Sequence, residues 1–261
     1  MPDTLRMTTE FRSRRVSALP APIQAEKDRA ESGGATIEDG VYTDLIQPVY
    51  DVLDGAGVWS DVVFFGVAGV RDVVSGSVAT LYDQSGNQND ATQGTTSARP
   101  TVVSDLTGGK DAVRYDGTDD FLSTSTASKS QPNSVFSLLD RKGNRSASWD
   151  GNTSRGWHLF NTNNSEIFAG TILSLNNRYS AGLRFWTAIY NGTNSEAIVD
   201  GTSDVTGDAG TNDAEDILLG RNQPSTNFTN DDALVYLFVN TKFSSSVRSD
   251  LRSICTDYYS L

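Results

Sequence analysis

The sequence predicts an all-β domain of short antiparallel strands, and three observations lead to that prediction. Glycine is abundant, with 23 among 261 residues, and it stands among many Ser, Thr, Asn and Asp residues, a composition typical of tight turns. Between these turns, short segments alternate apolar and polar residues as half-buried strands do. The dipeptide Asn191-Gly192 separates two such segments, residues 184–190 and 197–201, and predicts a tight hairpin turn.

Residues 1–30 are expected to form an extended basic arm. Basic residues outnumber acidic ones in this segment, whereas the whole chain has a formal charge of −12. Pro20 and Pro22 favour an extended path, and residues 23–30 have the composition of a short polar helix. A basic arm on an acidic body suggests docking to a neighbouring subunit, and the alternative is a disordered tail. The expected assembly contacts are Arg6, Arg12, Arg14 and Arg15.

Residues 31–75 are expected to form a helical segment that covers one end of the β-domain. Residues 36–39 have the composition of a helix cap, Pro48 suits a first helical turn, and Gly55 suits the end of a helix. Residues 59–65 are then expected to form an apolar plug. Apolar residues follow at near-helical spacing at Val41, Leu45, Val49 and Leu53.

Residues 76–261 are expected to form the β-domain itself, closed by a C-terminal helix. The segment 81–123 supplies turn residues, an extended Arg99-Pro100 step and a strand at residues 112–115. Apolar strand segments recur at residues 135–139, 157–160, 167–169, 217–221 and 233–240. Ser244 is expected to cap the final helix, because apolar residues from Val247 to Tyr258 then share one face.

These motifs resemble the concanavalin A-like, or laminin-G-like, jelly roll. The resemblance rests on Tyr82-Asp83-Gln84-Ser85-Gly86-Asn87, on Arg99-Pro100, and on residues 110–122, which read KDAVRYDGTDDFL. It implies a β-sandwich jelly roll with an N-terminal arm, a short helical segment and a C-terminal helix. The first phrase also resembles the catalytic domain of fungal-type arabinofuranosidases, which share this fold. The helical segment before the jelly roll resembles a feature of some virion proteins of tailed bacteriophages.

Charge and cysteine content restrict the partners and cofactors. The excess of acidic residues, 33 against 21 basic ones, argues against nucleic acid and anionic membrane surfaces as partners. Cys255 is the single cysteine, so neither an intrachain disulfide nor a cysteine-based zinc site is expected. No secretory signal is recognised near the N-terminus, and the apolar run at residues 62–70 is too short to span a bilayer. We expect no cofactor.

No catalytic constellation is expected. His158 is the only histidine, and its position in an apparent strand favours a structural role. Glu166, Glu196 and Glu215 are the glutamates of the β-domain, and they show no spacing typical of glycoside hydrolases. Oxygen-rich turns at Asp83 and at residues 116–120 suggest a weak calcium site, but turn formation explains them better than metal binding.

Sugar binding has one candidate side chain. Trp149 lies between Ser148 and Asp150, so we expect its ring to be exposed and able to stack on a sugar. The alternative is packing in the core, which explains most tryptophans in β-sandwiches.

Three functional hypotheses follow from these observations. The first is a non-enzymatic structural protein of a bacteriophage virion, in the capsid decoration or the tail, which is a homo-oligomer and contacts other virion proteins through its arm. The second is a carbohydrate-binding module that attaches to glycans on a host surface. The third is a glycoside hydrolase related to arabinofuranosidases.

Overall fold

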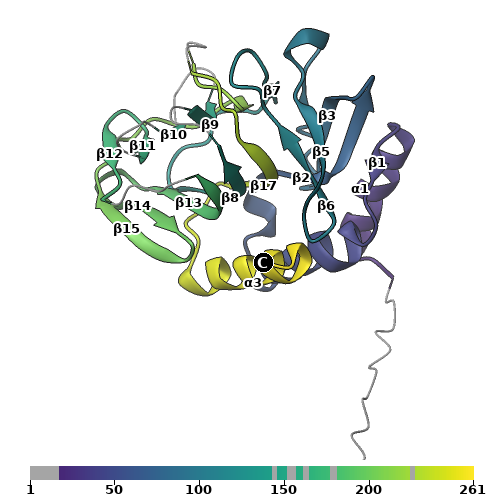
Figure 1. Ribbon diagram of the computed structural model, residues 1–261. Helices are drawn as coiled ribbons and strands as arrows, with labels where there is room; N and C mark the ends of the chain where they lie inside the picture. Colours follow the sequence, from purple (N-terminus) through teal and green to yellow (C-terminus); the bar gives the residue numbers. More distant parts are fainter. Residues whose placement is uncertain (1–17, 143–145, 152–156, 161–164, 177–180, 224–226) are drawn as a thin grey trace, which may run out of the picture.

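The molecule consists of a helical layer packed on two layers of β-strands (Figure 1). The computed structural model describes residues 18–142, 146–151, 157–160, 165–176, 181–223 and 227–261. All strand pairs are antiparallel, and the pairing continues from one layer into the other, so the strands form one continuous 17-stranded sheet. Among the described residues, no helix is long and apolar enough to cross a membrane.

The first layer is the central one, because it packs against the helices on one side and the second layer on the other. Its spatial order is β1 (Thr36–Ile37), β2 (Val62–Val74), β17 (Asp232–Val239), β8 (Asn133–Arg141), β13 (Gly182–Tyr190), β14 (Ser195–Val199) and β15 (Thr202–Gly207). The strands predicted around residues 135–139 and 233–240 are therefore confirmed.

The second layer follows from β2 through the β2–β3 pair. Its spatial order begins with the hairpin of β6 (Lys110–Arg114) and β5 (Thr101–Thr107) and continues through β3 (Ser77–Asp83), β4 (Ala91–Thr92), β7 (Leu122–Ser123), β16 (Ile217–Leu219), β9 (Ser146–Gly151), β10 (Trp157–Phe160), β11 (Ser165–Phe168) and β12 (Ile172–Ser174). A second connection between the layers is the β6–β17 pair.

Neighbouring residues of the central layer serve two different cores. In β2, Phe64 packs between the two layers while Phe65 faces the helices. In β13, Trp186 packs between the layers while Phe185 faces the helices, because successive side chains of a strand point to opposite faces. Both rings of this pair are buried. Each such ring contributes roughly 1.5–3 kcal/mol through removal of apolar surface from water.

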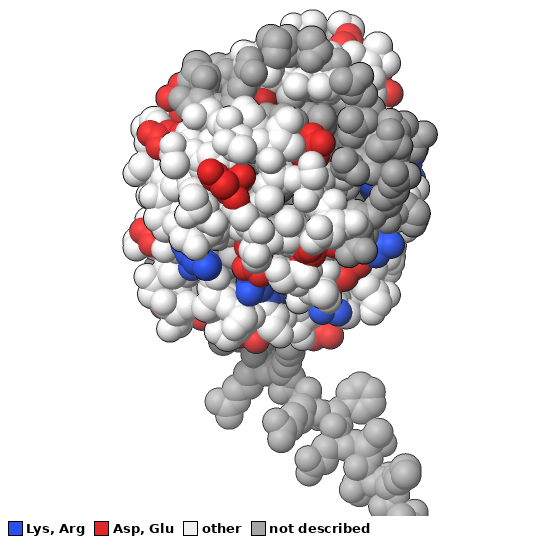
Figure 2. All heavy atoms as spheres, turned by 90° about the vertical axis from the view of Figure 1, so that its left-hand side faces the viewer, with Lys and Arg blue, Asp and Glu red and all other residues white. Residues whose placement is uncertain are grey.

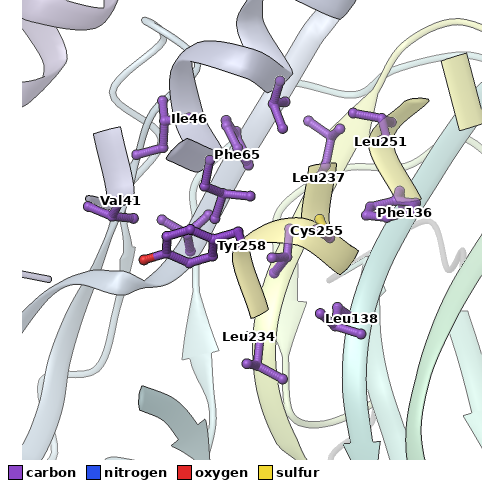
Figure 3. Close-up of a cluster of buried hydrophobic side chains, with 14 of the residues drawn as sticks. Val41, Ile46, Phe65, Phe136, Leu138, Leu234, Leu237, Leu251, Cys255 and Tyr258 are labelled. Atoms are coloured by element: carbon purple, nitrogen blue, oxygen red, sulfur yellow. The ribbon is translucent and has the colours of Figure 1, made fainter. Parts of the chain in front are cut away.

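The helical layer closes the second core. It contains α1 (Ala21–Ser32), the π-helix η1 (Val41–Ile46), α2 (Gln47–Gly55) and α3 (Ser245–Tyr259). Short 3-10 turns are η2 (Trp59–Asp61), η3 (Thr96–Ala98) and η4 (Gly192–Asn194). Figure 3 shows Leu251, Cys255 and Tyr258 of α3 among side chains of η1, β2, β8 and β17. Ser244 caps α3 as predicted, since its hydroxyl accepts a hydrogen bond from the Val247 amide at 3.2 Å.

The prediction that residues 31–75 are a helical cover is wrong for a large part of the segment. Residues 36–37 do not cap a helix but pair with β2, and the helical turns start after Gly40, whose backbone is left-handed. The expected plug at residues 59–65 divides into the 3-10 turn η2 and, from Val62, the start of β2, an inner strand of the central layer. Both faces of this strand are buried, so its sequence is continuously apolar and lacks the alternation of a half-buried strand.

The prediction that the arm stays extended as far as residue 30 is also wrong. Residues 21–32 form α1, and Pro22 lies in its first turn. The composition of residues 23–30 indicates a short helix there. Ile23 and Ala30 are fully buried against the body. The helix is therefore part of the folded domain.

The predicted hairpin is confirmed, but its turn is longer than predicted. Trp186 pairs with Val199 and Ile189 with Glu196, and residues 191–194 connect β13 to β14. Gly192 begins a 3-10 turn instead of a two-residue turn. Ser195 fixes this loop, because its hydroxyl accepts from the Asn191 amide at 2.9 Å and donates to the Gly192 carbonyl at 2.8 Å.

A substitution at Gly192 tests this turn. Gly192 has a φ of 54°, a left-handed conformation that β-branched residues adopt only with strain. We expect Gly192→Val to lower the free energy of unfolding by about 1 kcal/mol or more, and Gly192→Asn by less, because asparagine tolerates this region. Urea unfolding of the two variants measures the difference. Equal losses for Val and Asn would contradict the assigned backbone conformation.

Candidate functional site

The loop between β3 and β4 is built around one buried carboxylate. Asp83 is fully buried, and its oxygens accept hydrogen bonds from the amides of Phe65, Ser85 and Asn89, each at 2.9 Å. The Ser85 hydroxyl adds a fourth at 2.7 Å. Burial raises the pKa of Asp83, while these hydrogen bonds act in the opposite direction. The carboxylate thereby fixes the loop to the first half of β2.

Helix α1 holds the same loop from outside. The Arg29 guanidinium binds the Asp90 carboxylate through two nitrogens at 2.7 and 3.0 Å, and it also donates to the Asp83 carbonyl at 2.7 Å. The Tyr82 hydroxyl donates to the Gly33 carbonyl at 2.7 Å, just after the helix. From η1, the Tyr42 hydroxyl donates to the Gln84 side chain at 2.8 Å.

Two asparagines of this loop project over the start of β2. The Asn87 amide nitrogen donates to the Val62 carbonyl at 2.6 Å, and the Asn89 amide nitrogen donates to the Val63 carbonyl at 2.7 Å. Because the nitrogens point to the strand, the two side-chain oxygens stay available as acceptors. No described residue donates to either oxygen.

These asparagines line a polar pocket where four segments meet. The space that water can enter there measures about 310 Å³. Its wall consists of Ser60, Asp61, Val62, Val63, Asn87, Asn89, Thr126, Ala127, Lys129 and Asn240. The Oδ1 atom of Asn240 is buried and accepts no hydrogen bond from the described part of the chain. We refer to this set as the polar pocket.

Two charged groups in the polar pocket have no partner among the described residues. The ammonium of Lys129 and the carboxylate of Asp61 make no hydrogen bond or ion pair with described side chains. The backbone of Lys129 is fixed, however, by hydrogen bonds of 2.7 and 3.0 Å with Ala214. The pocket thus offers one cation, one anion and several amide and hydroxyl groups to a ligand.

A second, apolar pocket adjoins the polar one and extends between the two strand layers. The space in it that water can enter is about 30 Å³. Both pockets are lined by Val63, Thr126 and Lys129, so they meet at these residues. Aromatic rings of Trp149, Tyr190 and Phe238 form much of the inner wall.

The prediction that Trp149 is an exposed sugar-stacking ring is wrong. Trp149 is only 3% exposed and makes edge-to-face contacts with Tyr190 and Phe238, at ring-centre distances of 5.6 and 5.4 Å. The prediction is based on the polar neighbours Ser148 and Asp150. Both of these residues are buried and hydrogen-bonded, so they do not indicate an exposed loop. Trp149 therefore lines the apolar pocket from inside.

The oxygen-rich turns serve backbone geometry. The Asp83 oxygens are occupied by the four donors described above. In the second turn, potential ligand oxygens of Asp116, Asp119 and Asp120 lie within 4.8 Å of one another. One Asp116 oxygen accepts from the amides of Thr118, Asp119 and Asp120, and Asp120 accepts from the Asp116 amide at 3.0 Å. These bonds are what turn formation requires.

The remaining candidate residues do not gather at one site. Glu166 lies in β11, and burial raises its pKa. Glu196 of β14 is paired with Arg248 of α3 at 3.0 Å, whereas Glu215 lines the apolar pocket. His158 lies in β10, where it pairs with Ile167 of β11 and Trp149 of β9, and its side chain lies outside the described part of the structure. Arg6, Arg12, Arg14 and Arg15 also lie outside the described residues.

The charged side chains on one face of the molecule bear on its possible partners. Figure 2 shows the face over β11 to β15, where acidic side chains are scattered and Lys and Arg lie mainly toward the side of α3. The described part of this face has no continuous basic surface of the kind that nucleic acids require.

Comparisons with known proteins establish the fold. No protein-family model matches the chain, and no curated protein sequence does. Among solved structures, the ligand-binding domain of botulinum neurotoxin serotype D, in complex with N-acetylneuraminic acid, has a TM-score of 0.54 at 11% identity over 76% of this chain. The fold is a lectin-like jelly roll.

Two other similar structures are enzymes. Trypanosoma rangeli sialidase in complex with sialic acid has a TM-score of 0.53 at 10% identity over 76% of this chain. A GH54 α-L-arabinofuranosidase has a TM-score of 0.52 at 12% identity over 68% of this chain. The chain covers 33% of the sialidase, 51% of the arabinofuranosidase and 52% of the neurotoxin domain. None of the three is a virion protein, so the predicted virion role stays a prediction.

The second acidic turn generates a pH-dependent prediction. Burial, together with the Asp116 charge, raises the pKa of Asp120 from 3.8 to about 7. The folded state therefore binds this proton more tightly than the unfolded state. The resulting stabilisation is complete below the unfolded pKa of 3.8 and is lost as the pH rises through 7.

Asp120→Asn removes this titration. We compare the melting temperature of the variant with that of the unmodified protein at the same pH. The difference, variant minus unmodified protein, should be more positive at about pH 8 than at about pH 4. Asp119→Asn, at an exposed neighbour, is the matched control and should show a smaller change between the two pH values. Equal differences at both pH values for Asp120→Asn would contradict the raised pKa.

Proposed function

We propose that this protein is a carbohydrate-binding module without hydrolytic activity, and that a sugar binds in the polar pocket. The side-chain oxygens of Asn87 and Asn89, to which no described residue donates, carry the proposal, and Asn240 lines the same wall. The hydroxyl groups of a ligand can donate hydrogen bonds to these acceptors.

The chemistry of the wall suits a sugar. The side-chain oxygens of Asn87 and Asn89 can accept hydrogen bonds, while Ser60 and Thr126 can both donate and accept. A sugar presents several hydroxyl groups of the same dual character. A phosphate-rich ligand suits the pocket less well, because the described wall offers one ammonium, of Lys129, and also one carboxylate, of Asp61.

The similar structures support the proposal at the level of the fold. The neurotoxin domain and the sialidase are both complexes with sialic acid, and this chain covers 52% and 33% of them, respectively. At 10% and 11% identity, they do not assign a ligand to this chain.

Binding without hydrolysis is proposed because the polar pocket lacks a carboxylate pair. Most glycoside hydrolases place two carboxyl groups across the scissile bond, separated by about 5–10 Å. Asp61 is the only carboxylate in the described wall of the polar pocket. Asp150 and Glu215 line the adjoining apolar pocket, whose open space of about 30 Å³ is too small for a sugar ring. The host-adhesion role follows if the sugar belongs to a cell surface, and it is compatible with the predicted virion location.

Asn240→Ala tests the proposal against a matched control. Asn230 also has a buried Oδ1 without a partner among described residues, but it lies beside Gly117 and does not line the polar pocket. We expect Asn240→Ala to weaken sugar binding about tenfold, the effect of one lost hydrogen bond of about 1.4 kcal/mol. Asn230→Ala should leave binding unchanged.

The measurement begins with a panel of immobilised mono- and oligosaccharides and continues by calorimetry with the sugars that bind. Release of reducing sugar is followed in parallel and should not occur. Absence of binding across the panel, or an unchanged affinity in Asn240→Ala, would reject the polar pocket as a sugar site. Hydrolysis abolished by substitution of one Asp or Glu would reject the non-enzymatic role.

A further inference from the structure

We infer that the bound sugar carries an acetamido group, whose methyl enters the apolar pocket while the sugar ring occupies the polar pocket. This inference rests on the proposed function and specifies its ligand. Val63, Thr126 and Lys129 line both pockets, so the pockets are adjacent and a ligand that spans them would pass these three residues.

The size and lining of the apolar pocket favour a small apolar group. About 30 Å³ is open to water there, enough for one or two small groups and far too little for a sugar ring. The rings of Trp149, Tyr190 and Phe238 offer a methyl group close contacts. A sugar hydroxyl in the same place would lose its water without gaining equivalent hydrogen bonds from these rings.

The polar groups at the edge of the apolar pocket complement an amide. An acetamido group has one N–H donor and one carbonyl acceptor. Lys129 can donate to that carbonyl, and Glu215 can accept from that N–H. Neither side chain has a hydrogen-bond or ion-pair partner within the described part of the chain, so both are available to a ligand.

The first measurement compares matched sugars. N-acetylglucosamine and N-acetylgalactosamine are titrated against glucose and galactose by calorimetry. We expect each acetamido sugar to bind at least about 10-fold more tightly, within the range that one small apolar group contributes in a pocket. Equal affinities within each pair would overturn the inference and leave the proposed sugar site standing. Absence of binding for all four sugars would also overturn the inference, whereas absence of binding across the whole panel would overturn the proposed function.

The second measurement fills one pocket at a time. Ala214 lines the apolar pocket alone, is half-buried, and adjoins Lys129 by backbone pairing. Ala214→Leu should reduce the preference for the acetamido sugar from at least about 10-fold to about 1-fold, with little change for glucose. Ala127 lines the polar pocket alone and is exposed, so Ala127→Leu should weaken both sugars together.

Thermal unfolding establishes that both variants are folded before they are titrated. Ala214→Val adds fewer atoms at the same position and replaces Ala214→Leu if the larger residue prevents folding. A preference for acetamido sugars that persists in a folded Ala214 variant would place the methyl elsewhere and overturn the inference.

Discussion

The buried carboxylate of Asp83 is the interaction on which the candidate site depends. It joins β2 to the loop after β3, through hydrogen bonds from Phe65 on one side and from Ser85 and Asn89 on the other. A buried charged group is tolerated only where donors surround it, and here they restrict the loop to one conformation. Arg29 then connects this loop to α1. The side chains that line the polar pocket are therefore positioned by contacts that reach both the central layer and the N-terminal helix.

The two-sided burial of the central layer explains where the pockets lie. Its inner strands are covered by helices on one face and by the second layer on the other, so they offer no exposed face to a ligand. Access is left at the end of the sandwich, where β2 starts near Val62 and β17 ends before Asn240. Loops at the end of a rigid β-sandwich are a common place for binding residues, since they vary without disturbing the core.

Much of the fold could be predicted from the sequence, but the site could not. Alternation revealed the hairpin around Asn191-Gly192, and the Ser244 cap revealed α3, because both signals are local. β2 escaped prediction since it is buried on both faces and shows no alternation. The polar neighbours of Trp149 suggested exposure, although hydrogen bonds within the core satisfy them. The polar pocket combines four segments distant in the sequence, and only Asn87 and Asn89 belonged to a recognised motif. Spatial convergence of this kind leaves no periodic signal.

NMR titration is the sharpest test of the polar pocket as a sugar site. Uniformly ¹⁵N-labelled protein is titrated with N-acetylglucosamine, and chemical-shift changes are assigned to the backbone amides of individual residues. We expect the largest changes on the residues that line the polar pocket, which are 60–63, 87, 89, 126, 127, 129 and 240. Saturable changes confined to another surface, for example the face over β11 to β15, would contradict the proposed sugar site.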